Sequence, residues 1–135
     1  PYRRQRQMCI RDRDFNISHS GEFILAVFAV GMDIGVDVQE MAECPDYREI
    51  AENFYTAEEA EDVKNEGPDL FFQYWAAKEA YVKALGIGLG RGMDFFSVRN
   101  EKIAEKDKKD QDWFLYPVRI KGYAAYVAAH KKGDR

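Results

Sequence analysis

The chain has 135 residues, of which 46% are hydrophobic and 14% aromatic, and its formal net charge is −4. A chain of this size is expected to form one compact unit that buries roughly two thirds of its unfolded surface. The acidic balance argues against a nucleic-acid-binding protein. We find no apolar run of about 18 residues and no signal-peptide pattern, so we expect no membrane span. The two cysteines, Cys9 and Cys44, lack metal-type spacing, which favours a reduced, cytoplasmic protein.

The first 14 residues, PYRRQRQMCIRDRD, differ from the rest of the chain. They are basic, show no hydrophobic period and carry no strand or helix signature. We interpret residues 1–14 as a leader that is either non-native or a disordered basic arm, and we predict no helix or strand there. The structured part is therefore expected to begin within a longer protein.

The remaining sequence alternates between apolar runs and turn residues. Strands are predicted at 22–30, 34–39, 95–99, 113–120 and 122–130. The continuous apolar run 22–30 predicts a buried strand, whereas the charged stretch 100–112 predicts a turn or hairpin tip in solvent. Helices are predicted between the strands, at 45–54, 56–67 and 68–85. This order predicts an α+β fold with an antiparallel sheet packed against helices.

The helix boundaries are marked by local signals. Pro45 and Pro68 occupy plausible first helical positions. Thr56 and Glu59 have the spacing of a capping box. Gly86 follows the long helix where a C-terminal glycine is expected. We assign the glycines of the loop GIGLGRG, 86–92, to this cap and a tight turn, and give the loop no catalytic role.

The first candidate for chemistry is the strand segment GVDVQE, 35–40. Alternate residues of a strand share a face, so Asp37 and Gln39 should point to one side and Val36 and Val38 to the other. A carboxylate beside an amide can hold a hard cation through oxygen. The structural alternative is a solvated strand face, which would make Asp37 an ordinary surface residue.

The second candidate lies in FQYWAAKEAYVKALGIG, 72–88, where charges interrupt a largely apolar helix. Glu79 and Lys83 are four residues apart and lie in one row. An exposed pair of this kind would be an ordinary helix contact. In apolar surroundings the carboxylate instead needs a cation or a strong partner, such as a divalent metal together with Lys83. Lys78 lies within the apolar stripe, where its long stem would let the ammonium reach the surface.

The third candidate is FNISHSG, 15–21, which precedes the apolar run. We interpret it as a turn whose hydroxyl groups and imidazole form an anion cradle, with Ser18 and His19 as its main members. A plain polar turn is the alternative. A serine hydrolase is disfavoured, because neighbours on an extended chain point apart and no G-x-S-x-G elbow is present. His130 is expected to be a surface residue.

Taken together, FNISHSG, GVDVQ and FFQYWAAKEAYVKALGIGL resemble the 4′-phosphopantetheinyl transferases. The resemblance covers residues 15–99 and is closer to the larger, surfactin-synthetase-activating type, built as two similar halves, than to the holo-acyl-carrier-protein synthases. It implies 15–33 as the end of an N-terminal half and 34–131 as the C-terminal transferase domain. The chain would then be N-terminally truncated.

The resemblance implies a Mg²⁺-dependent transfer of 4′-phosphopantetheine from coenzyme A to a serine of a carrier protein, releasing 3′,5′-ADP. Asp37 and Glu79 would hold the metal, and Glu79 would also take the serine proton, either alone or through a metal-bound water. Lys83 would pair with the coenzyme A diphosphate, with Lys78 as a weaker candidate. Ser18 and His19 would contact coenzyme A phosphates.

Two departures from the family pattern bear on activity. Gln39 stands where many members have Glu, so the metal site should be weaker. Most of the N-terminal half is also missing, with the basic residues that hold the 3′-phosphate and adenine. The alternatives are therefore an inactive truncated fragment that binds coenzyme A, and a structural α+β domain.

Several carrier proteins remain open as partners: acyl, peptidyl and aminoadipate-reductase carrier proteins. Carrier proteins of this system are acidic by family expectation, so a basic docking patch is predicted. Arg91, Arg99 and Lys121 are its candidate members. Neither a nucleic acid nor a membrane is expected as a partner.

Overall fold

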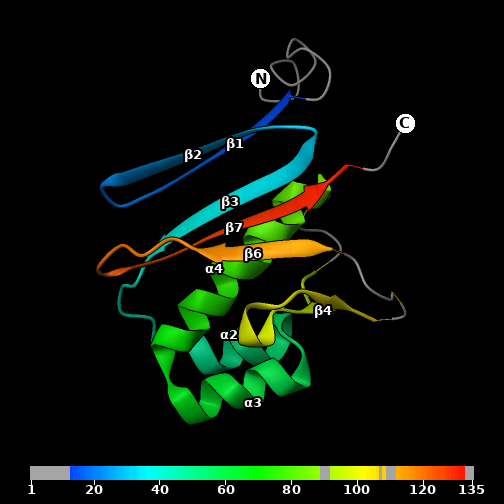
Figure 1. The fold of residues 1–135 in the computed structure, drawn as a ribbon. Helices are drawn as coiled ribbons and strands as arrows, with labels where there is room; N and C mark the ends of the chain where they lie inside the picture. The colour runs from blue at the N-terminus through cyan, green and yellow to red at the C-terminus, as the bar shows by residue number, and fades with distance from the viewer. Residues whose placement is uncertain (1–12, 89–91, 107, 109–111, 133–135) are drawn as a thin grey trace.

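The computed structural model describes residues 13–88, 92–106, 108 and 112–132. They form an α+β fold, as predicted, in which an antiparallel sheet packs against helices (Figure 1). The elements in chain order are β1 (Arg13–Ser20), β2 (Phe23–Val30), β3 (Met32–Glu40), α2 (Tyr47–Phe54), α3 (Ala57–Glu66), α4 (Pro68–Leu85), β4 (Phe96–Ser97), the short 3₁₀ helix η2 (Arg99–Glu101), β5 (Ala104–Glu105), β6 (Trp113–Pro117) and β7 (Tyr123–Lys131).

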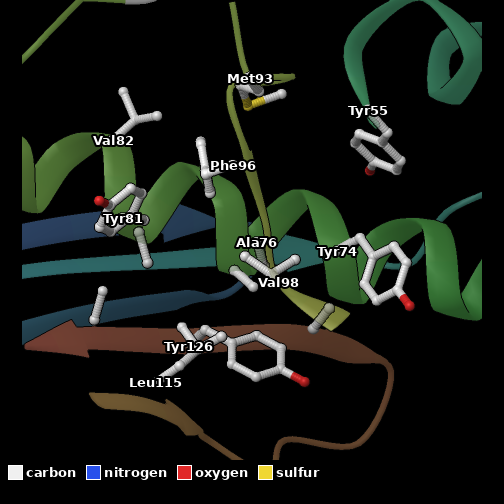
Figure 2. Packing of buried hydrophobic residues seen from close by; sticks show 14 of the residues in the cluster. Tyr55, Tyr74, Ala76, Tyr81, Val82, Met93, Phe96, Val98, Leu115 and Tyr126 are labelled. Atoms are coloured by element: carbon white, nitrogen blue, oxygen red, sulfur yellow. The ribbon is translucent and has the colours of Figure 1, made fainter. Parts of the chain in front are cut away.

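The central sheet has the order β3-β7-β6, with all neighbours antiparallel. The long helix α4 packs across β3 and β7, and the core includes residues of α4, the sheet, α2, α3 and the segment 93–98. Figure 2 shows Tyr81 and Val82 of α4 among the buried residues, with Tyr126 of β7 and Leu115 of β6. Gly35 of β3 allows this close approach, because a Cβ there would lie 2.1 Å from the Ala80 carbonyl oxygen.

The predicted helix signals are confirmed. The Thr56 side chain accepts the Glu59 N–H and the Glu59 side chain accepts the Thr56 N–H, so the capping box caps α3 in both directions. Pro68 opens α4, and Gly86 closes it in the left-handed conformation with φ 73°. The first helix begins at Tyr47, after the predicted Pro45.

The segment 13–30 departs from prediction, because it forms the hairpin β1–β2 and not a turn followed by a buried strand. FNISHSG, predicted as a turn, is mostly strand, and β1 begins two residues inside the predicted leader. β2 is largely exposed: Ile24, Phe28 and Val30 retain 74%, 75% and 68% of their accessible surface. An apolar run specifies a strand, but its burial depends on which elements cover it.

Side chains of β1 join the hairpin to the free edge of β3. The Val36, Val38 and Glu40 amides of β3 donate to polar side chains of β1, and their acceptors are Asn16 Oδ1, Ser18 Oγ and Ser20 Oγ, at 2.9, 3.1 and 2.9 Å. The hairpin thus lies beside β3 (Figure 1). Side-chain bonds fix it there, and in the described residues β1 and β3 belong to separate sheets. The division of the chain at residue 33 stays a prediction.

Two of the C-terminal strands are shorter than predicted. The strand predicted at 95–99 is reduced to β4, with η2 beginning at Arg99, and the strand predicted at 113–120 ends at Pro117. β5, within the predicted polar turn 100–112, pairs with β4; positions 107 and 109–111 lie outside the described residues. Among the helices described, none is both long and apolar enough to cross a membrane.

Candidate functional site

Asp37 lies in the middle of β3 and is 4% exposed. Gln39 Nε2 donates to Asp37 Oδ2 at 2.7 Å, which confirms that the two side chains share a face. Val36 and Val38 are fully buried, as predicted for the opposite face of the strand, and Asp37 is buried on its own face as well. Asp37 is therefore an interior carboxylate, and the solvated strand face considered as an alternative is wrong.

Helix α4 brings Lys83 to this carboxylate. The Lys83 ammonium lies 3.4 Å from Asp37 Oδ1 and donates to the Val36 carbonyl at 3.0 Å. Its side chain remains 30% exposed, so the contact opens to solvent. Glu79 lies one turn earlier on the same row of α4 and is half-buried. The structure thus brings Asp37 of β3 together with Glu79 and Lys83 of α4, which lie more than 40 residues further along the chain.

The ionised forms of the two carboxylates, Asp37 and Glu79, are disfavoured in this site. Burial raises the pKa of Asp37, although the hydrogen bond from Gln39 and the Lys83 charge oppose the change. Burial also raises the pKa of Glu79, the Asp37 charge raises it further, and Lys83 opposes both effects. Two carboxylates in one partly desolvated site favour a bound cation, because a cation stabilises both ionised forms.

The chemistry of these donors suits a hard cation such as Mg²⁺. Mg²⁺ is commonly held by one or two carboxylates together with substrate phosphates and water. Asp37 and Glu79 supply two carboxylates, and the charge of Asp37 acts on Glu79. In the described parts of the chain, no group of three or more His, Cys, Asp or Glu side chains forms a closed metal site. Because Mg²⁺ prefers octahedral coordination, two carboxylate ligands would leave positions for other ligands.

The strand geometry separates Ser18 from His19. Ser18 is buried, and its hydroxyl donates to Asp37 Oδ1 at 3.4 Å while accepting the Val38 amide. His19 is exposed and, as the next residue of β1, points to the other face of the hairpin. The turn in which both would form one cradle is therefore not present. The alternation in NISHS was a strand signal that the sequence reasoning missed.

Lys78 lies away from the Asp37 group. Its side chain is 0% exposed, so of the two alternatives left open by the sequence, a buried position and one at the surface, the structure has the buried one. The ammonium lies 2.7 Å from Glu59 Oε1 and donates to the carbonyl oxygens of Met93 and Phe96 at 2.7 and 2.6 Å. The three N–H donors of this ammonium are thus all engaged by protein atoms. The sequence identified Glu59 as a capping residue but not as the partner of Lys78.

The residues of the predicted docking patch are not gathered on one surface by any described contact. Arg99 is engaged by Asp62 and Glu58 of α3. Lys121 is exposed at the β6–β7 turn, and Arg91 lies outside the described residues. The patch stays a prediction. His130 is half-buried and stacks on Trp113, so its expected surface position is only partly correct.

A family model for the 4′-phosphopantetheinyl transferase superfamily matches residues 33–128. The match includes the whole Asp37, Glu79 and Lys83 group. This chain belongs to that superfamily. The superfamily predicted from the sequence motifs is thereby confirmed, and so is the closer likeness to the larger type, which includes the relatives from Bacillus subtilis.

Three curated transferases illustrate the similarity. The 4′-phosphopantetheinyl transferase Sfp of Bacillus subtilis (strain 168) is 38% identical over 92 residues, covering 65% of this chain and 40% of the relative. The transferase ffp of Bacillus subtilis is 40% identical over 98 residues, covering 67% and 42%. The L-aminoadipate-semialdehyde dehydrogenase-phosphopantetheinyl transferase of Rattus norvegicus is 29% identical over 144 residues, covering 90% and 47%. The chain spans less than half the length of each of these transferases.

A solved structure shares the transferase fold. It is a holo-(acyl-carrier-protein) synthase from Bacillus anthracis in complex with CoA (3′,5′-ADP), with a TM-score of 0.57 and 22% sequence identity. The superposition covers 75% of this chain and 96% of the synthase. At this identity the likeness establishes the fold alone.

Proposed function

We propose that this chain carries the transferase site of a 4′-phosphopantetheinyl transferase, moving 4′-phosphopantetheine from coenzyme A to a carrier-protein serine. The observation that carries the proposal is the group of Asp37, Glu79 and Lys83 within the family-matched stretch. A partly buried carboxylate pair beside a solvent-accessible ammonium suits a reaction between a diphosphate and a hydroxyl.

The transfer is a substitution at phosphorus. The serine oxygen forms a bond to the phosphorus that carries pantetheine, and the bond from that phosphorus to the 3′,5′-ADP oxygen breaks. The serine proton passes to the Glu79 carboxylate, and 3′,5′-ADP leaves with the electron pair. Burial and the Asp37 charge raise the pKa of Glu79, which makes it a better proton acceptor.

Asp37 and Glu79 would hold Mg²⁺, which neutralises the diphosphate charge when bound. Lys83 would pair with the same diphosphate, since its ammonium is accessible. Ser18 would orient Asp37 by its hydroxyl and lie near the phosphates. His19 is retained as a coenzyme A contact on its exposed face, whereas Lys78 is left out because its ammonium is fully buried.

The proposed partners are coenzyme A and an acyl, peptidyl or aminoadipate-reductase carrier protein. The names of the similar transferases support this class, and the rat relative supports the third carrier. A cytoplasmic location is proposed with it, in keeping with the free thiol of Cys44.

The test is the intact mass of a purified apo-carrier protein after incubation with this chain, coenzyme A and magnesium. We expect a gain of one phosphopantetheine group that disappears with EDTA and in Asp37→Ala. No gain from a folded chain, with each of the three carrier classes, would contradict the proposed activity.

A truncated coenzyme A-binding fragment is the second candidate, because the chain spans only 28–47% of the similar transferases. Calorimetry with coenzyme A separates the two candidates. Magnesium-dependent binding without transfer would favour the fragment. The absence of both would favour the structural α+β domain.

A further inference from the structure

The Lys78–Glu59 ion pair joins α4 to α3 in the interior, and both side chains are 0% exposed. Lys78 makes three polar contacts of 2.6–2.7 Å, to Glu59 and to the carbonyl oxygens of Met93 and Phe96. An ammonium has three N–H donors, so its hydrogen-bonding capacity is complete. The ammonium also lies 4.2 Å from the centre of the Phe96 ring, which adds a cation–π contact.

Glu59 extends this connection to two backbone segments. Its Oε2 accepts the Val98 amide at 2.7 Å, and its Oε1 accepts the Thr56 amide at 3.1 Å as part of the capping box. Together, Glu59 and Lys78 connect the start of α3, the middle of α4 and the segment 93–98. None of these bonds touches the Asp37 group.

Stability alone does not explain such a pair. The desolvation of two charges offsets much of their attraction, and apolar residues of similar size often serve equally well. The directional bonds do restrict geometry, because α4 cannot rotate or slide without breaking several of them. On its opposite side, α4 is fixed by the Lys83 bond to the Val36 carbonyl and by the close approach of Ala80 to Gly35. Glu79 lies between these two attachments.

We propose that Lys78 and Glu59 are positioning residues, which set the rotation of α4 and so hold Glu79 at Asp37 for cation and substrate binding. The inference rests on the proposed function. It assigns the two residues no contact with substrate, and it predicts that removing both charges together affects the reaction more than folding.

The main test replaces both charges by neutral groups of similar size, in Lys78→Met/Glu59→Gln. The matched control is Tyr74→Phe, which removes the 2.8 Å hydrogen bond from α4 to Asp62 of α3 without affecting the Lys78 contacts. Thermal unfolding by circular dichroism measures the stability of each variant. Calorimetry measures coenzyme A binding as magnesium is varied, and the carrier-protein mass assay gives kcat.

We expect the folded double variant to need roughly 10–100-fold more magnesium for half-maximal coenzyme A binding, as for other residues that orient metal ligands. Its kcat should fall by a similar factor, whereas Tyr74→Phe should stay within about twofold of the unmodified chain in both measurements. Unchanged magnesium dependence and kcat in a folded double variant would overturn the inference.

If the double variant fails to fold, Glu59→Gln alone decides, since it keeps Lys78 and its carbonyl bonds. A several-fold rise in the magnesium requirement would support positioning, and no change would overturn it. An unmodified chain without magnesium-dependent coenzyme A binding or transfer would overturn the proposed function, and the inference with it. Normal activity in the unmodified chain with equal values in the variants would overturn the inference alone.

Discussion

Helix α4 carries two lysines five residues apart that have opposite surroundings. Lys78 is fully buried, with an anionic partner and two carbonyl oxygens around its ammonium. Lys83 is 30% exposed, has longer contacts with Asp37 and can still bind a ligand. A charged side chain in an apolar helix can therefore have either of two roles. A complete set of protein partners indicates a structural role, and an incomplete set beside a second carboxylate indicates a site.

The largest effect is expected for Glu79→Gln, which tests whether the group beside Lys83 is a functional site. This variant removes the proposed proton acceptor and one metal ligand. The amide cannot accept the serine proton, so kcat should fall by roughly 10²–10⁴-fold. The mass assay measures this change. Thermal unfolding should be little altered, because burial already disfavours the ionised form of Glu79. Activity within tenfold of the unmodified chain would contradict its assigned role.

On the structural side, Lys78→Met alone should destabilise the fold by about 3–5 kcal/mol, because Glu59 would remain as an uncompensated buried charge. Urea unfolding monitored by circular dichroism measures the loss. Lys121→Met, at an exposed position on the β6–β7 turn, is the control and should change the unfolding free energy by less than about 0.5 kcal/mol. Equal effects at the two positions would refute the structural assignment of Lys78.

Lys83→Met should show the reverse pattern. Its contact with Asp37 is partly solvent-exposed, so the unfolding free energy should change by less than about 1 kcal/mol. Coenzyme A affinity should fall by about tenfold, because the ammonium no longer pairs with the diphosphate. Calorimetry measures the coenzyme A affinity. An unchanged affinity would show that Lys83 does not bind the diphosphate.

The smallest effect concerns pH. Burial raises the pKa of Asp37, so the folded state holds its proton more tightly than the unfolded state does. This contribution favours folding below the unfolded pKa and is lost as the pH rises through the folded pKa. In EDTA, Asp37→Asn should therefore be more stable than the unmodified chain at pH 7, and the difference should diminish toward pH 3. Melting curves across this pH range check the sign of the stability difference. An Asp37→Asn variant that is less stable than the unmodified chain at pH 7 would contradict the prediction.

The sequence predicted those features that depend on local chemistry. The capping box at Thr56, the proline at the start of α4 and the glycine at its end concern bonds within a few residues, so their positions were correct. The shared face of Asp37 and Gln39 followed from strand alternation in the same way.

Features that depend on distant neighbours were not predicted. Lys78 and Glu59 are 19 residues apart, and a helical pattern indicates burial without naming the partner. The bond between Ser18 and Asp37 depends on how the hairpin lies against β3, which no local signal defines. For the same reason, the apolar character of 22–30 did not reveal that its strand is exposed.

The exposed face of β2 has a practical consequence for handling the protein. Ile24, Phe28 and Val30 all project from a strand that, within the described residues, pairs only with β1. Such a surface promotes self-association through edges and apolar contacts. Samples should therefore become turbid as concentration rises, and light scattering should register this before any assay does. Replacing Ile24 and Phe28 with lysine should extend the working concentration range, because repulsion between like charges opposes stacking.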